Sequence, residues 1–169
     1  MYPFNEEKLS ALMAGQKIDL VLVCSRHNMR YLTGYFYHFY ENFTRIGVSQ
    51  YMPLLGVPAR GAEDSFYVGV AGERGQMEAE ELWVQNRINS ARDAVSAARQ
   101  AAIMAKQLGF ETGRIGVEVP FMPTEAYLEL QRSLPQATIV DANPLLDELR
   151  AVKDAVSYTH LTLPTKRIV

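Results

Sequence analysis

The sequence has little cysteine, little histidine and little net charge. Its 169 residues include one cysteine, Cys24, which excludes an intramolecular disulfide and fits a reducing cytoplasm. The formal net charge of −2 gives no basic surface for nucleic acid or an anionic membrane. No apolar run approaches the ~20 residues that span a bilayer, and the acidic N-terminus does not resemble a signal peptide. We therefore predict a cytoplasmic domain that binds neither nucleic acid nor membrane.

Metal and phosphate sites find little support in the sequence. The three histidines (His27, His38 and His160) have no helical pairing with one another, and one cysteine cannot build a thiolate cluster. The glycine-rich segment "GVAGERGQMEAEE", residues 69–81, departs from the spacing of a phosphate loop, and its glutamates would repel phosphate. We interpret it as a flexible surface turn and expect no metal in this chain.

Three further residues carry side chains that could do chemistry. Cys24 ends an apolar segment with no base fixed beside it, so an inert buried thiol is the favoured interpretation. Glu118 and Asp141 each end or interrupt a predicted strand, where a carboxylate could point into a cleft. We favour the simpler interpretation that both carboxylates meet water. The chain thus shows no complete catalytic constellation.

The first half of the chain predicts a helix, a buried strand and a second, short helix. Asn5 is a plausible N-cap of a first helix that Gly15 ends. The run Ile18–Ser25 is apolar enough for a strand covered on both faces. Asn28 is then a candidate N-cap of a short helix that ends at Gly34.

A pair of strands should follow. Residues 51–70 predict two strands joined by a turn at Arg60–Asp64. Pro53 and Pro58 lack backbone donors, which places the first of these strands near a sheet edge or at a bulge. The acidic segment Met77–Trp83 is expected to be an exposed helix or loop.

The second half alternates helices with strands. The longest helix is expected to begin at a capping box of Ser90 and Asp93 and to end at Gly109. The segments "RIGVEV", "PTEAYLELQRSL", "ATIVDA" and "NPLLDELRAVK" then predict strand, helix, strand and a helix with Asn143 as N-cap. The fold class is therefore α/β, a mixed β-sheet with helices on both faces.

Three segments, in this order, resemble the N-terminal domain of the creatinase and Xaa-Pro aminopeptidase/dipeptidase family. They are "HNMRYLTGY" at residues 27–35, "IGVEV" at Ile115–Val119 and "LLDELRAVKD" at Leu145–Asp154. The resemblance implies a ribonuclease H-like domain over residues 1–154 that binds no metal itself. In the family a following domain supplies two Asp, one His and two Glu that hold two divalent ions, and none of these ligands can be assigned here. The chain should therefore be inactive alone, as a fragment of an Xaa-Pro metallopeptidase.

The last residues do not fit the family pattern. Residues 155–169, including "VSYTHLTLPTKRIV", have no helical apolar face and contain Pro164. This stretch resembles translated sequencing-adapter DNA, so we expect a non-native tail in which His160 has no role.

Seven aromatic residues fall between Arg30 and Phe43. Such rings suit core packing, a dimer interface or the wall of a substrate pocket. In dimeric relatives this loop reaches the neighbouring subunit, so His38, Tyr40 and Arg45 are candidates to contact a peptide or small amide substrate. The partners implied are the chain's own catalytic domain and a second subunit. A stand-alone protein-binding or dimerisation module without catalysis is the alternative.

Overall fold

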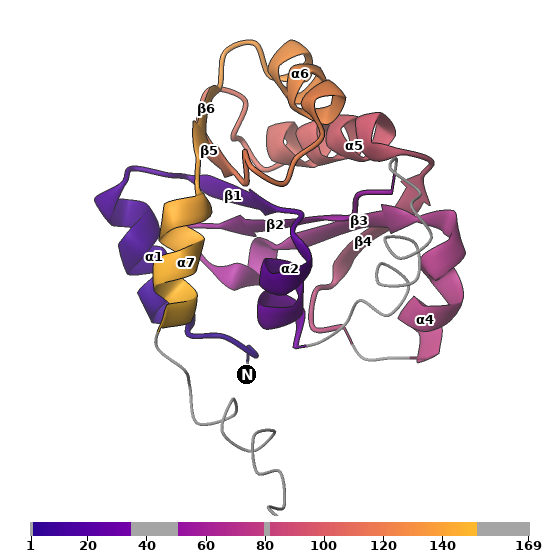
Figure 1. Ribbon diagram of the computed structural model, residues 1–169, viewed down its shortest axis with the longest axis horizontal. Helices are drawn as coiled ribbons and strands as arrows, with labels where there is room; N and C mark the ends of the chain where they lie inside the picture. The colour runs from indigo at the N-terminus through magenta and orange to yellow at the C-terminus, as the bar shows by residue number, and fades with distance from the viewer. Residues whose placement is uncertain (1, 35–50, 80–81, 152–169) are drawn as a thin grey trace, which may run out of the picture.

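The computed structural model describes residues 2–34, 51–79 and 82–151, which form a mixed six-stranded sheet with helices on both faces. The sheet order is β4-β3-β2-β1-β5-β6, and the fold class predicted from the sequence is confirmed (Figure 1). The strands are β1 (Leu20–Val23), β2 (Leu54–Pro58), β3 (Phe66–Val70), β4 (Asn86–Ala91), β5 (Arg114–Val117) and β6 (Thr138–Asp141). The helices are α1 (Glu6–Gly15), α2 (Arg26–Thr33), α4 (Arg74–Ala79), α5 (Ala94–Gln107), α6 (Thr124–Ser133) and α7 (Asn143–Ala151), with 3-10 turns η1 (Ala62–Asp64) and η2 (Ala71–Glu73).

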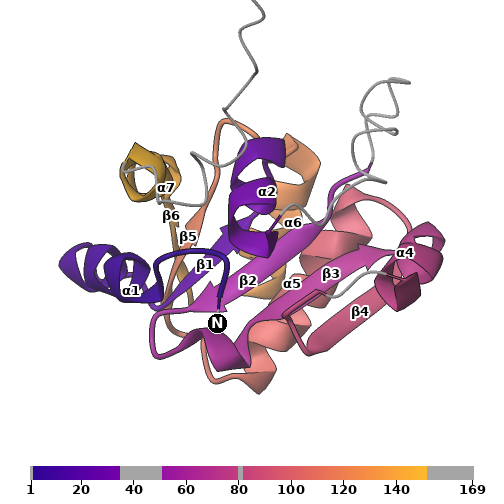
Figure 2. The same cartoon turned by 90° about the horizontal axis from the view of Figure 1, so that it is seen from below.

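The central strand β1 divides two hydrophobic cores. It pairs antiparallel with β2 and parallel with β5. Because side chains alternate along a strand, Leu20 and Leu22 join the core under α5 and α6, whereas Val21 and Val23 join the core under α1, α2 and α7. The two helix layers lie on opposite sides of the sheet in Figures 1 and 2. The prediction of a strand covered on both faces is confirmed.

The helix ends follow local chemistry. The Asn5 side chain accepts a hydrogen bond from the amide of Lys8 at 2.9 Å, as expected of an N-cap. Gly34 and Gly109 end α2 and α5 with positive φ angles, a conformation that costs glycine little. Alanines bring α5 close to the sheet, and the buried ones are Ala94, Ala97, Ala98, Ala101, Ala102 and Ala105.

Three predicted caps were wrong. Ser25, not Asn28, caps α2 with its hydroxyl, because the Asn28 side chain is used in a tertiary contact. Asp93 does cap α5, but its capping-box partner is Ser96, while Ser90 lies in β4. Asn143 is the first residue of α7 and its Oδ1 has no hydrogen-bond partner among the described residues, so it is not a cap.

The predicted edge strand is in fact interior. β2 lies between β1 and β3, so the interpretation of Pro53 and Pro58 was wrong. Pro53 precedes β2 and Pro58 is its last residue, paired with Leu20. At a strand end a missing N–H removes little of the hydrogen-bonded ladder.

The glycine-rich segment and its continuation are more ordered than predicted. Residues 71–79 form η2 and α4, and Glu73 is completely buried rather than part of a flexible surface turn. Leu82 is also buried, and the Trp83 ring packs on Tyr2 and Phe4 while its Nε1 donates to the Leu32 carbonyl at 2.8 Å. These side chains close one end of the core beneath α2, which the local acidic composition does not reveal.

No helix in residues 2–34, 51–79 and 82–151 is long and apolar enough to cross a membrane. The aromatic segment after Gly34 and the predicted non-native tail lie outside the described residues.

Candidate functional site

The carboxyl ends of β1 and β5 form the topological switch point of the sheet. β1 leads into α2, which packs in one core, and β5 leads towards α6, which packs in the other. In open α/β sheets the crevice created by such divergence is the usual place for a ligand. This crevice is therefore the first candidate site.

A buried carboxylate fills the crevice. Glu118, fully buried directly after β5, accepts from the backbone amides of Cys24 at 2.6 Å and Ser25 at 2.7 Å through Oε2. Its Oε1 accepts from Nδ2 of Asn28 at 2.6 Å. The prediction that Glu118 meets water was wrong, because the N-terminal end of α2 offers it three donors. Asp141, by contrast, is exposed as expected.

The crevice has the chemistry of an anion-binding site, and the anion that occupies it is the carboxylate of Glu118 from the same chain. Backbone amides at the start of a helix, together with the helix dipole, favour negative charge. Here the amides of Cys24 and Ser25 already donate to Glu118. An external phosphate or carboxylate would have to displace the buried Glu118 carboxylate, which already accepts three hydrogen bonds. The arrangement is therefore suited to fixing α2 rather than to binding an anion.

Cys24 lies beside this carboxylate and is fully buried. Burial, and secondarily the negative charge of Glu118, raises the pKa of the Cys24 thiol well above its usual value. A neutral thiol is a poor nucleophile, so the inert interpretation is supported.

Cys24 should consequently resist alkylation in the folded protein. With iodoacetamide at pH 8, we expect labelling to be at least about tenfold slower than in guanidinium chloride, because only the thiolate reacts and the folded state disfavours it. Mass spectrometry of quenched time points measures both rates. Equal rates in the two conditions would contradict the buried, neutral thiol.

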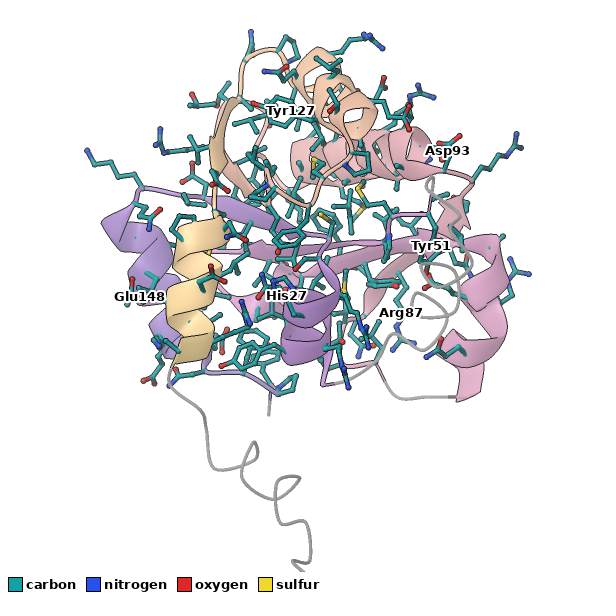
Figure 3. The ribbon with its side chains drawn as sticks, in the orientation of Figure 1. His27, Tyr51, Arg87, Asp93, Tyr127 and Glu148 are labelled. Atoms are coloured by element: carbon teal, nitrogen blue, oxygen red, sulfur yellow. The ribbon has the colours of Figure 1, made fainter. Side chains whose placement is uncertain are left out.

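His27, the second residue of α2, is half-buried, and Figure 3 shows it on the side of the sheet that carries α2 and α7. Its Nε2 lies 3.3 Å from the Ser25 hydroxyl, and its ring meets Phe121 edge-on with the ring centres 4.9 Å apart. Burial, and secondarily the Arg150 cation, lowers the pKa of His27. The carboxylates of Glu118 and Asp147 act in the opposite direction, but their effect is smaller. The imidazole is therefore neutral at pH 7.

One of two exposed apolar side chains that follow β5 contacts this histidine. Val119 and Phe121, in the turn from β5 to α6, are 46% and 47% exposed. A neutral imidazole beside exposed apolar side chains is suited to contact with another surface, whereas it offers no activated nucleophile.

A second hollow lies near the amino ends of β5 and β6, whereas the switch point lies at carboxyl ends. This cavity of about 330 Å³ is lined by Lys106, Glu111, Leu134, Pro135 and Gln136, which precede these strands in the chain. Except for Leu134, these residues are exposed. The hollow is thus an open surface feature and is separate from the switch point.

The described residues do not fit a metal ion. Within residues 2–34, 51–79 and 82–151, no group of three His, Cys, Asp or Glu side chains is placed to hold one. The candidate substrate contacts His38, Tyr40 and Arg45 lie outside these residues and stay a prediction.

The Asn28–Glu118 pair was missed by sequence reasoning although both residues stand in the segments that carried the family resemblance. Asn28 is in "HNMRYLTGY" and Glu118 is in "IGVEV". The third segment supplies Leu145, Leu146 and Leu149 to the same core as Met29 and Leu32 of the first. An amide and a carboxylate within two of these segments were the available signal, and the fold brings the two side chains into contact at 2.6 Å.

Comparisons with known proteins agree with this fold. The model of the creatinase/prolidase N-terminal domain family matches residues 6–152. The N-terminal domain of the cytoplasmic peptidase PepQ from Mycobacterium tuberculosis is similar at 22% identity and a TM-score of 0.64, covering 86% of this chain and 97% of that one. A comparison with curated proteins finds no match.

Longer solved structures are also similar. A dipeptidase from Pyrococcus horikoshii matches at 22% identity with a TM-score of 0.66, over 89% of this chain and 37% of its own. An Xaa-Pro dipeptidase from Bacillus anthracis matches at 14% identity with a TM-score of 0.67, over 91% of this chain and 37% of its own. The chain thus spans little more than a third of these two proteins. With the family model covering nearly all of the described fold, this chain belongs to the creatinase/prolidase N-terminal domain family.

Proposed function

We propose that this chain is the non-catalytic N-terminal domain of an Xaa-Pro peptidase or creatinase-type metallohydrolase. The observation that carries the proposal is the family match over residues 6–152. The chain's correspondence to 37% of each of two dipeptidases supports a larger parent protein. Hydrolysis would then belong to a following domain that holds two divalent ions and acts on a peptide or small amide.

The domain's own contribution would be dimerisation and shaping of the substrate pocket. Its exposed Val119 and Phe121 and its neutral His27 support a role in surface contact rather than chemistry. His38, Tyr40 and Arg45 remain the proposed contacts to substrate, since an arginine can clamp a carboxylate and the other two can donate hydrogen bonds. The lone cysteine supports a cytoplasmic location, where thiols stay reduced.

Sequencing the source DNA beyond codon 154, followed by an assay, tests this proposal. We expect an open frame that encodes the five metal ligands, and a full-length product that hydrolyses Xaa-Pro dipeptides only when a divalent metal is present. The fragment comprising residues 1–151 should show no hydrolysis with the same substrates. A true stop codon after residue 169, with a folded and inactive protein, would instead support a stand-alone binding module.

If the full-length enzyme is active, single variants identify the substrate contacts. Arg45→Ala should raise KM for dipeptides by at least about tenfold with a smaller change in kcat, because a lost charge-assisted hydrogen bond weakens binding by ~1.5–3 kcal/mol. Arg60→Ala, on an exposed turn with an ion pair to Asp64, is the matched control and should leave KM unchanged. An unchanged KM in Arg45→Ala would remove that residue from the pocket.

A further inference from the structure

A second buried carboxylate lies far from the switch point, between β3 and α4. Glu73, the last residue of η2, is fully buried. Its carboxylate accepts from the hydroxyl of Tyr51, from the hydroxyl of Tyr67 at 3.0 and 3.2 Å, and from the amide of Val70 at 3.2 Å. Three separate pieces of chain are thereby joined at one side chain. Figure 3 shows Tyr51 on the α4 side of the sheet, away from His27.

The fold makes room for this carboxylate at one glycine. A Cβ atom added to Gly69 would lie 1.9 Å from Oε2 of Glu73 and 2.7 Å from the ring of Tyr67. Such distances are far inside van der Waals contact, so only glycine at position 69 lets the carboxylate rest against β3. The space left by Gly69 and the three donors (the Tyr51 and Tyr67 hydroxyls and the Val70 amide) together form the binding site of the Glu73 carboxylate.

We propose that Glu73 is a proton-controlled latch that fastens Tyr51 and the η2–α4 segment to β3. The bonded groups are two phenols and one amide, and no charged side chain among the described residues contributes to the shift in its pKa. As far as residues 2–34, 51–79 and 82–151 show, the carboxyl is desolvated and held by neutral donors, an arrangement that is sensitive to proton binding.

The direction of the response follows from burial. Desolvation, the largest effect, raises the pKa of Glu73 above its ordinary value despite the opposing hydrogen bonds from Tyr51, Tyr67 and Val70. The closed latch therefore holds its proton more tightly than the open, hydrated carboxyl does. Opening becomes more favourable as the pH rises from the ordinary glutamate pKa through the raised one, and it levels off above that value.

The latch fixes the chain next to the aromatic segment. Tyr51 is the first described residue after residues 35–50, which include His38, Tyr40 and Arg45. Any effect of the latch on a substrate pocket rests on the proposed function. The latch itself does not depend on that function.

Hydrogen exchange of the Val70 amide, followed by NMR in the 169-residue chain between pH 4 and pH 7, tests the latch. After correction for intrinsic exchange, the opening constant should rise with pH by on the order of tenfold for each unit by which the Glu73 pKa is raised. Glu73→Gln cannot ionise and should give a constant that is independent of pH. Glu129→Gln is the matched control, because Glu129 is a buried carboxylate bonded to Arg99 and Arg132, and it should preserve the rise at Val70.

Two outcomes would overturn the proposal: a pH-independent opening constant at Val70 in the unmodified chain, or a pH dependence that survives in Glu73→Gln. If Glu73→Gln does not fold, the carbon-13 titration of the Glu73 carboxyl in the unmodified chain decides. A midpoint above that of an ordinary glutamate supports the latch, and a midpoint at or below it refutes it. None of these results depends on whether the chain belongs to a peptidase, so the failure of either proposal can be recognised separately.

Discussion

Asn28→Asp is expected to lower the free energy of unfolding by about 4 kcal/mol, since it removes a hydrogen bond to a buried charge and puts a second carboxylate against it. In the native protein Nδ2 of Asn28 donates to Oε1 of Glu118 at 2.6 Å, with both residues fully buried. Guanidinium denaturation at pH 7 measures the loss. Asn5→Asp is the matched control, because the exposed N-cap of α1 functions equally well with either residue and should change stability by less than ~0.5 kcal/mol.

The pH dependence and a compensating substitution distinguish this mechanism from a general packing defect. Two adjacent buried carboxyls can share a proton, so the Asn28→Asp deficit should shrink as the pH falls into the range where carboxyls protonate. Adding Glu118→Gln to Asn28→Asp restores one amide and one carboxylate, with the Gln oxygen left to accept from the amides of Cys24 and Ser25. We expect the double variant to lie within about 1 kcal/mol of the native protein. Additive losses in the double variant would show that the pair is not the determinant.

The contrast between Asn5 and Asn28 shows what the sequence could and could not predict. Asn5 was correctly placed as a cap because its partner, the Lys8 amide, is three residues away and the pattern is local. Asn28 was wrongly placed as a cap because its partner, Glu118, is 90 residues away. The same holds for Glu73, which looked like part of a polar surface turn but bonds to Tyr51 and Tyr67.

Strand prediction followed the same division. β1 was predicted from its apolar run, whereas β4, with the sequence "NRINSA", was not, because it is a largely polar edge strand recruited by pairing with β3. The crevice was therefore not predicted as a site. Sequence patterns placed Cys24 and Glu118 towards the ends of two strands, but the burial of Glu118 between those strands is a tertiary property.

The second large expected effect concerns the packing of β2 against β3. Phe66 is fully buried, and its ring covers Gly56 on the paired strand, where an added Cβ would lie 2.3 Å from two ring carbons. Phe66→Ala should lower the free energy of unfolding by about 4 kcal/mol through lost burial and the cavity left behind. Gly56→Ala should cost ~1–3 kcal/mol through overpacking. Denaturant unfolding of each variant measures both losses.

The stability losses from Phe66→Ala and Gly56→Ala should be strongly coupled, because both arise from the space in which the Phe66 ring lies against Gly56. In the Phe66→Ala background the new methyl of Gly56→Ala enters the vacated volume, so its cost should fall to roughly zero and the two losses should not add. Gly15→Ala is the matched control, since nothing lies within 4 Å of its added Cβ, and it should cost the same in either background. Additive losses for positions 56 and 66 would mean that the ring does not rest on the glycine. A coupling of at least ~1 kcal/mol would establish that Gly56 is required by tertiary packing in the middle of the sheet, where strand propensity alone disfavours glycine.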